Sequence, residues 1–293
     1  MYYHPVRAMD DPGLKDPSSR PMQHNKPYPA VSPSRPELSA SGKIVIITGA
    51  GSSIGRATAL SFARAGASKV VLVGRTTSKL EETQSLLPCD STIYTANVQD
   101  EKAMGEIAAS VGTWHILVLA AAYISPPASI QTSSVEEWWM NLETNLKGTV
   151  VAAKSLLPMV NPTRAVVIGY SAAITFPAVM TPGISAYAIS KLAIVKLIEF
   201  IAAEYPSVFT AALHPGFVET EMSRKAEWIL RLCLLMMLPG HFAVWLASQD
   251  AAFLNGRYVW ANWDVDELKE KAAEIQSGQL LTAGIQGWPF GAA

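Results

Sequence analysis

The sequence predicts an α/β fold with a single doubly wound parallel sheet of about seven strands and helices on both faces. Short β-branched runs recur along the chain from residue 44, and longer stretches with helical periodicity follow them. Apolar runs without polar alternation are typical of strands buried on both faces. Strands that alternate with helices indicate parallel βαβ units.

The expected strands are residues 44–47, 70–73, 93–95, 116–119, 165–168 and 209–213, with a seventh at one sheet edge at 257–260. The sequence shows no internal repeat and no second domain. We therefore expect one nucleotide-binding domain over residues 41–265, with a substrate lid at about 222–240 and a C-terminal tail at 266–293.

Composition excludes several classes of protein. Apolar residues make up 49% of the 293, charged residues 16%, and the net charge is −1. This profile indicates a large buried core and no attraction for nucleic acid. Cys89 and Cys233 are too few and too far apart for a disulfide framework or a cysteine metal cluster. We therefore expect a reducing, cytoplasmic location and no metal.

The N-terminal region differs from the rest of the chain. Eight of the 19 prolines lie between Pro5 and Pro36, among serines and few aliphatic residues. Proline removes a backbone donor, and a segment with little apolar surface cannot offset its ordering entropy. Residues 1–40 are therefore expected to form a disordered or loosely attached arm. They lack the apolar core of a secretory signal, and their aspartates argue against a transit peptide.

The most apolar stretch is 228–238. A membrane span needs about 20 such residues, so no span is expected. Two interpretations remain: a core helix, or a flexible Met- and Leu-rich wall over an apolar substrate.

A glycine-rich turn follows the first strand and opens into a helical pattern. Its expected cofactor-binding residues are Gly49, Ser52, Ser53, Ile54 and Gly55. A helix that begins there points unpaired amides at the turn, and glycine lets a pyrophosphate approach the backbone. The position of the turn between strand and helix favours a Rossmann-like dinucleotide site over an ordinary tight turn.

The end of the second strand indicates which cofactor binds. A carboxylate at that position takes the ribose 2′-hydroxyl of NAD, whereas a basic residue accommodates the 2′-phosphate of NADP. Here Gly74 is followed by Arg75 and two threonines. NADP is therefore favoured over NAD, unless Arg75 is simply a solvated loop charge.

Tyr187 and Lys191 stand four residues apart at the start of a long helical pattern. Residues at this spacing share a helix face, so the ammonium of Lys191 can approach the Tyr187 hydroxyl and favour its phenolate. That arrangement would make Tyr187 a proton donor or acceptor near neutral pH. An ordinary pair on a helix face would show the same spacing.

The order of these motifs is more specific than any one of them. Along the chain come the 48–55 turn, Asn145-Leu146-Lys147-Gly148, Ser171 after the fifth strand, Tyr187 with Lys191, and His214-Pro215-Gly216-Phe217-Val218-Glu219-Thr220. Over residues 42–265 the chain resembles the short-chain dehydrogenase/reductase (SDR) family. Residues 254–268 further resemble members from filamentous fungi.

The resemblance implies a role for each matching residue. Ser171 would bind the substrate oxygen, Tyr187 would exchange its proton, and Lys191 would lower the tyrosine pKa and hold the nicotinamide ribose. Asn145 would support a water that links the lysine to solvent. The remaining contacts implied are Asn97 and Val98 with adenine, and Val218 and Thr220 with the nicotinamide carboxamide. Family members also form homodimers or homotetramers, usually through the helices that contain Asn145 and Tyr187.

Three features depart from the family pattern. Ser53 replaces the middle glycine of the turn, so its side chain would crowd the phosphate or take a strained φ. Leu119-Ala120-Ala121-Ala122 replaces the usual Asn-Asn-Ala-Gly, which removes polar contacts around the cofactor. The Ser171–Tyr187 spacing is three residues longer than usual, and an enlarged loop would absorb the difference.

The expected function is an NADP-dependent oxidoreductase that interconverts a ketone and a secondary alcohol on a lipophilic small molecule. Pocket residues are expected in 172–186, in the lid and in the tail, and in fungal relatives such enzymes often act in secondary metabolism. One alternative is a non-catalytic dinucleotide-binding regulator, motivated by Ser53 and the missing asparagines. Another makes the 228–238 stretch and the N-terminal arm an attachment to a membrane or a partner.

Overall fold

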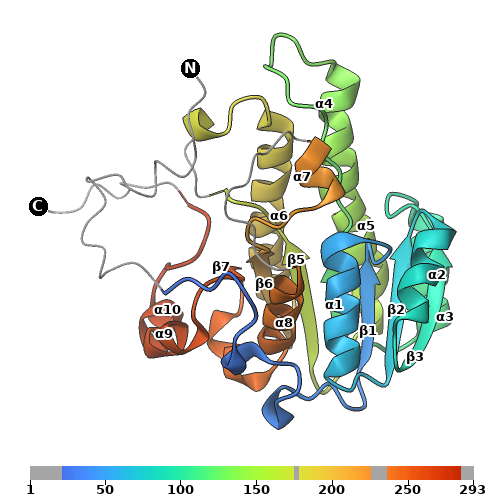
Figure 1. The fold of residues 1–293 in the computed structure, drawn as a ribbon, viewed down its shortest axis with the longest axis vertical. Coiled ribbons are helices and arrows are strands. Elements are labelled where there is room, and N and C mark those ends of the chain that lie inside the picture. The colour runs from blue at the N-terminus through green and yellow to red at the C-terminus, as the bar shows by residue number, and fades with distance from the viewer. Residues whose placement is uncertain (1–21, 175–177, 226–235, 285–293) are drawn as a thin grey trace, which may run out of the picture.

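The computed structural model describes residues 22–174, 178–225 and 236–284. Within these residues seven parallel strands form one sheet in the order β3-β2-β1-β4-β5-β6-β7 (Figure 1). The strands are β1 (Ile44–Thr48), β2 (Lys69–Gly74), β3 (Asp90–Thr95), β4 (Ile116–Leu119), β5 (Ala165–Tyr170), β6 (Val208–His214) and β7 (Arg257–Trp260). The predicted fold class and all seven predicted strands are confirmed.

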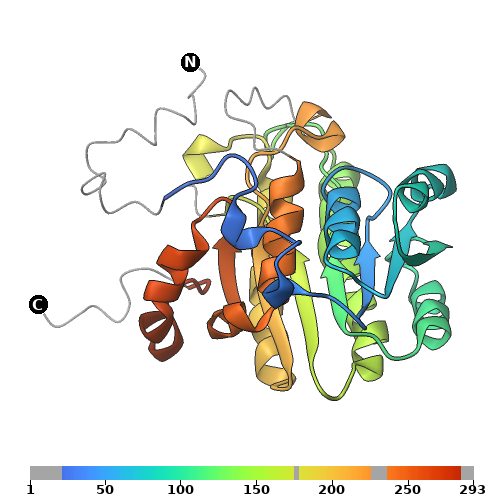
Figure 2. The same cartoon turned by 60° about the horizontal axis from the view of Figure 1, so that its bottom comes forward.

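Helices cover both faces of the sheet, as Figure 2 shows. They are α1 (Ser53–Arg64), α2 (Thr77–Ser85), α3 (Glu101–Val111), α4 (Val135–Leu142), α5 (Gly148–Leu156), α6 (Ser185–Glu204), α7 (Glu221–Lys225), α8 (Met237–Leu246), α9 (Val265–Glu270) and α10 (Ala272–Ser277). On one face Ile47 packs in a core with α1 and α8, and on the other Ile46 packs with α3, α5 and α6. Adjacent strand residues point to opposite faces, so both must be apolar.

The strand order sets where a ligand can bind. The chain runs outward from β1 to β2 and β3, and then returns to place β4 on the other side of β1. A crevice forms at the carboxyl ends of the strands on either side of such a reversal. The chain segments that leave β1 and β4 therefore meet at this end of the sheet.

The prediction that residues 1–40 are disordered is wrong for residues 22–40. His24 donates its backbone N–H to the Asn262 carbonyl at 2.7 Å, and its ring lies 2.8 Å from the Asp264 carboxylate. Val31 and Leu38 are buried in the core between the sheet and α8. Pro29 and Pro36 begin short 3₁₀ helices, where a fixed φ and a missing N–H are tolerated. Residues 1–21 lie outside the described residues.

The C-terminal region covers the free edge of the sheet. The Tyr258 N–H donates to the Leu281 carbonyl at 2.8 Å, and the Arg257 guanidinium donates to the carbonyls of Ile275 and Gly278. An exposed edge strand would invite pairing with another chain, so this segment protects β7. Of the 228–238 stretch only residues 236–238 are described, so the two interpretations of that stretch lie outside the described residues. None of the described helices combines the length and apolar content needed to cross a membrane.

Candidate active site

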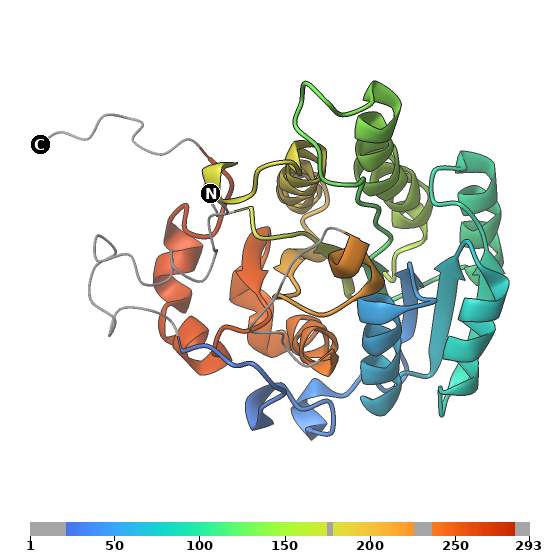
Figure 3. The same ribbon diagram turned by 45° about the horizontal axis from the view of Figure 1, so that its top comes forward.

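A pocket of about 320 Å³ lies at the carboxyl ends of β1, β2, β4 and β5. Figure 3 looks onto this end of the molecule, where α7, in orange, lies over the centre. Twelve of the predicted site residues line the pocket: Gly49, Ser52, Ser53, Ile54, Gly55, Arg75, Asn97, Val98, Ser171, Tyr187, Lys191 and Thr220. Asn145 and Val218 are buried but are not among the lining residues.

The turn from β1 into α1 has the close packing that its glycines predict. A Cβ on Gly49 would lie 2.8 Å from backbone atoms of Ala121, and a Cβ on Gly55 would collide with the Gly49 carbonyl oxygen. Gly49 also has φ +71°. Only glycine fits both positions, and residues 51–55 at the start of α1 line the pocket. A helix N-terminus with this access is suited to a phosphate.

Ser53 adopts the strained backbone conformation that the sequence suggested. Its φ is +48°, in the left-handed region that glycine occupies without steric cost. The preceding residue, Ser52, has φ −159° and is in ordinary extended conformation. The strain is therefore confined to the position where the family has glycine.

A brace that we did not predict joins β1 to the segment after β4. The Thr48 hydroxyl oxygen accepts the backbone N–H groups of Ala120 at 3.1 Å and Ala121 at 3.3 Å. These amides belong to the segment where the family has asparagines. Backbone groups thus hold the pocket wall although the asparagine side chains are missing. A threonine in a glycine-rich turn is a weak sequence signal, because its partners lie 72 and 73 residues away.

Asn145 supports the segment that follows β4, which forms one wall of the pocket. It lies in a π-helical turn (Glu143–Lys147) between α4 and α5 and is fully buried. Its Oδ1 accepts the Tyr123 N–H at 2.7 Å, and its Nδ2 donates to the Tyr123 carbonyl and the Ser190 hydroxyl at 2.9 Å each. π-helical turns occur frequently at functional sites. Here the turn positions the buried Asn145 amide to bind the backbone of Tyr123, beyond β4, and the Ser190 side chain of α6.

The side chains predicted to be catalytic meet where β5 ends and α6 begins. The Lys191 Nζ lies 5.7 Å from the Tyr187 ring centroid and donates to the Tyr170 carbonyl at 2.9 Å. The Ser171 hydroxyl donates to the Lys191 carbonyl at 2.8 Å. The structure therefore brings Ser171, Tyr187 and Lys191 together, and all three are buried.

Burial controls the titration of the two ionisable groups. It lowers the pKa of Lys191 to about 7, because the low-dielectric interior disfavours the ammonium. It also raises the pKa of Tyr187 above its ordinary value. This direction is opposite to the one expected from the charge of Lys191, so desolvation outweighs the charge effect in this structure.

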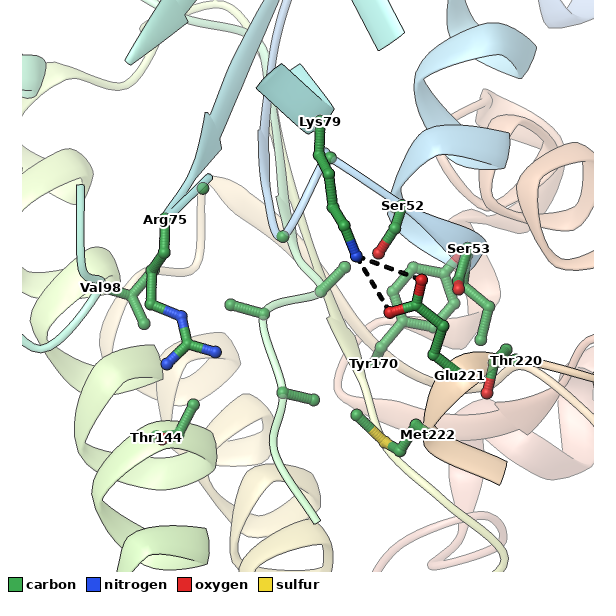
Figure 4. A pocket seen from close by; sticks show the side chains of 18 of the residues that line it. Ser52, Ser53, Arg75, Lys79, Val98, Thr144, Tyr170, Thr220, Glu221 and Met222 are labelled. Carbon is green, nitrogen blue, oxygen red and sulfur yellow. Dashed lines mark hydrogen bonds and ion pairs between the residues drawn. The ribbon is translucent and has the colours of Figure 1, made fainter. Parts of the chain in front are cut away.

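Arg75, Asn97 and Val98, which follow β2 and β3, line one side of the pocket. Figure 4 shows the Arg75 side chain extending toward Thr144. Arg75 is exposed and forms no ion pair or hydrogen bond with the described residues. Asn97 is also exposed, and its Oδ1 already accepts the Gln99 N–H at 3.2 Å.

The segment after β6 closes the opposite side. Thr220 precedes α7, its hydroxyl oxygen accepts the Ser223 N–H at 2.9 Å, and its own N–H donates to the Ser223 hydroxyl at 2.8 Å. Glu221, the next residue, forms an ion pair with Lys79 across the pocket, and Met222 also lines it. We did not predict Lys79 or Glu221 as site residues. Within the described residues no group of three or more His, Cys, Asp or Glu side chains is arranged to hold a metal.

Three comparisons with known proteins agree with this geometry. The family model described as short chain dehydrogenase matches residues 43–228. The chain is 32% identical to the short chain dehydrogenase mpl6 of Monascus purpureus over 278 residues, which cover 88% of this chain and 93% of that protein.

Solved structures resemble the chain as well. A short chain dehydrogenase from Pseudomonas syringae is 26% identical, with a TM-score of 0.70 over 78% of this chain and 98% of that one. A protein from Beutenbergia cavernae, described as an NAD(P)-dependent gluconate 5-dehydrogenase with NADP bound at low occupancy, is also 26% identical. Its TM-score is 0.67 over 77% of this chain and 97% of that one. With its seven-stranded fold, its glycine turn and the match over 43–228, this chain belongs to the short-chain dehydrogenase/reductase family of oxidoreductases.

Proposed function

We propose that this protein is an NADP-dependent oxidoreductase that interconverts a ketone and a secondary alcohol on a lipophilic small molecule. The observation that carries the proposal is the meeting of Ser171, Tyr187 and Lys191 at one end of a pocket whose other end is the glycine turn. A dinucleotide bound along this pocket would place its nicotinamide beside Tyr187. The bound cofactor supplies or accepts the hydride.

Each reactive side chain has a distinct task in this proposal. Ser171 hydrogen-bonds the substrate oxygen, and Tyr187 donates or accepts the proton at that oxygen. When Lys191 is protonated, its charge favours the ionised form of Tyr187, and its ammonium also holds the nicotinamide ribose. Asn145 supports a water between the lysine and solvent. Thr220 and Val218 contact the carboxamide, and Asn97 and Val98 contact adenine.

The preference for NADP rests on Arg75. It is the first residue after β2, it lines the pocket, and none of the residues between Gly74 and Thr77 is acidic. A guanidinium at this position can pair with a 2′-phosphate, and no carboxylate stands at the end of β2 to accept the 2′-hydroxyl of NAD. Arg75→Gln should therefore weaken the binding of NADP much more than the binding of NAD.

The preference for a lipophilic substrate rests on the surroundings of Tyr187. Ile124 and Ile184 are buried against the Tyr187 ring, and Ala172 and Met222 pack on the same cluster. Substrate contacts were expected from residues 172–186, the lid and the tail. Among the described residues of these segments, Met222 of the lid lines the pocket. Apolar surroundings at a reacting carbon favour an apolar substrate and exclude water.

The decisive experiment combines cofactor binding with turnover. The purified protein is incubated with oxidised or reduced NADP and a panel of apolar ketones and secondary alcohols. Tyr187→Phe should reduce turnover by roughly 10²-fold or more, because proton transfer is lost, and leave the affinity for NADP unchanged. Tyr205→Phe, at the exposed end of α6, serves as the matched control.

Each result of that experiment has a clear meaning. Turnover that persists in Tyr187→Phe would refute the assigned role. Binding of NADP without turnover of any substrate would instead favour the non-catalytic regulator, for which the strained Ser53 is the motivating observation.

The cellular setting follows from the same resemblance. Relatives come from filamentous fungi, including Monascus, Emericella and Aspergillus. We propose a role in fungal secondary metabolism, in the cytoplasm, as a homodimer or homotetramer. Exposed apolar side chains on α4, α5 and α6 are suited to such an assembly: Trp139, Met140, Val150, Ile189, Leu192 and Phe200.

A further inference from the structure

An ion pair crosses the pocket between two segments that are distant in the sequence. The Lys79 Nζ, in the first turn of α2, lies 3.1 and 3.0 Å from the two carboxylate oxygens of Glu221, at the start of α7. Both residues line the pocket, and Figure 4 shows their side chains meeting beside Ser52. The Lys79 ammonium therefore lies beside the glycine turn.

Lys79 is close to where a 2′-phosphate would bind. α2 directly follows β2, and the residue at the end of β2 faces the 2′ position of the ribose in dinucleotide folds. The first turn of α2 also packs on the glycine turn, since a Cβ on Gly51 would lie 3.1 Å from the Lys79 Cβ. Arg75 and Lys79 are thus two cations of the segment that follows β2, and both line the pocket, while Lys191 is buried beside Tyr187.

The ion pair is of a kind that another anion can displace. The Lys79 side chain is 43% exposed and that of Glu221 is 70% exposed. Ion pairs this accessible to water contribute little to stability. A phosphate group carries nearly two negative charges and three acceptor oxygens, so it is a stronger partner for an ammonium than one carboxylate.

We propose that Lys79 is a second specificity-determining residue, which binds the 2′-phosphate together with Arg75, and that Glu221 competes with this phosphate for Lys79. The inference rests on the proposed use of NADP. When Lys79 turns to the phosphate, Glu221 is released. The reciprocal hydrogen bonds of Thr220 and Ser223 still hold the start of α7 in place.

The test measures the dissociation constants of NADP and NAD by calorimetry. Glu221→Gln should tighten NADP binding by roughly threefold or more and change NAD binding less, because a competing negative charge is removed. Lys79→Gln should weaken NADP binding by roughly tenfold and NAD binding much less. In the double variant Lys79→Gln/Glu221→Gln the affinity should equal that of Lys79→Gln alone, since Glu221 acts only through Lys79.

A matched control separates this effect from the loss of any surface ion pair. Glu101→Gln removes the exposed Lys154–Glu101 pair, which joins α3 to α5 and does not line the pocket. It should leave both affinities unchanged.

The outcomes separate this inference from the proposed function. If the wild-type protein binds NADP no more tightly than NAD, the proposed cofactor preference fails and the inference fails with it. If the wild-type protein prefers NADP but the Glu221→Gln and Lys79→Gln variants keep the wild-type affinity ratio, only the inference fails. Equal weakening of NADP and NAD in Lys79→Gln would also overturn it, because Lys79 would then not read the 2′-phosphate.

Discussion

Replacing Ser53 with glycine should stabilise the protein, although most single substitutions are destabilising. A non-glycine residue in the left-handed region costs about 1–2 kcal/mol, and Ser53 has φ +48°. Its hydroxyl makes no hydrogen bond with the described residues, so little is lost with the side chain. Glycine adds unfolded-chain entropy worth about 0.5–1 kcal/mol, which offsets part of the gain.

The expected net stabilisation of Ser53→Gly, taken between the middles of these two ranges, is therefore about 0.7 kcal/mol. For a domain of this size that free energy corresponds to a rise in Tm of roughly 1–4 °C. Thermal unfolding followed by circular dichroism measures the shift, and urea unfolding gives the free energy directly. Calorimetry with NADP on the same variants then reports whether the serine side chain also hinders phosphate binding.

Two neighbouring variants make this prediction specific. Ser52→Gly, at φ −159°, has no strain to relieve and should lower the Tm. Ser53→Ala keeps the strained φ and removes only the hydroxyl, so its Tm should stay near that of the wild type. A Tm for Ser53→Gly at or below the wild-type value would refute the reasoning, since relief of the backbone strain would then be too small to matter.

Three other predictions follow from the described contacts. Asn145→Ala should destabilise the protein by about 1–3 kcal/mol in urea unfolding, because the amide that joins Tyr123 to Ser190 is lost; an unchanged midpoint would contradict this. The folded-state pKa of Lys191 is about 7, below its ordinary value, so the unfolded chain binds more protons above that pH and stability should rise with pH from about 7 to 9. That rise, at most about 1.4 kcal/mol per pH unit, should be absent in Lys191→Met. Phe200→Asp, which places a charge on the exposed apolar face of α6, should lower the mass measured by light scattering if that face joins subunits, and an unchanged oligomeric mass would exclude this face.

The sheet could be predicted from the sequence because its signal is local. In a strand buried on both faces every residue must be apolar, and β1, β2 and β4 show this in short uninterrupted runs. The disorder predicted for residues 22–40 was wrong, because the prediction used the average composition of the segment and a few apolar side chains are enough to anchor it. Val31 and Leu38 reach the core, and the polar partners of His24 lie about 240 residues away. No local pattern indicates such partners.

The site likewise contains features that the local sequence predicts and features that depend on contacts between distant segments. The glycine turn and the Tyr187–Lys191 spacing were visible because local backbone geometry places those residues. The Thr48 brace and the Lys79–Glu221 pair were not visible, since each joins residues at least 70 positions apart through the completed fold. The three-residue excess in the spacing before Tyr187 did not displace Ser171, which lies directly after β5 and bonds to α6.

The pKa of Tyr187 shows why spacing alone could not give the chemistry of the site. A cation four residues away on a helix favours the phenolate only while that cation is charged. Burial holds the pKa of Lys191 near 7, so the fraction of lysine that carries a charge falls as the pH rises above neutrality. Burial also opposes ionisation of Tyr187 itself. The spacing of the two residues predicts the direction of a charge effect, whereas the completed fold supplies the desolvation that reverses it.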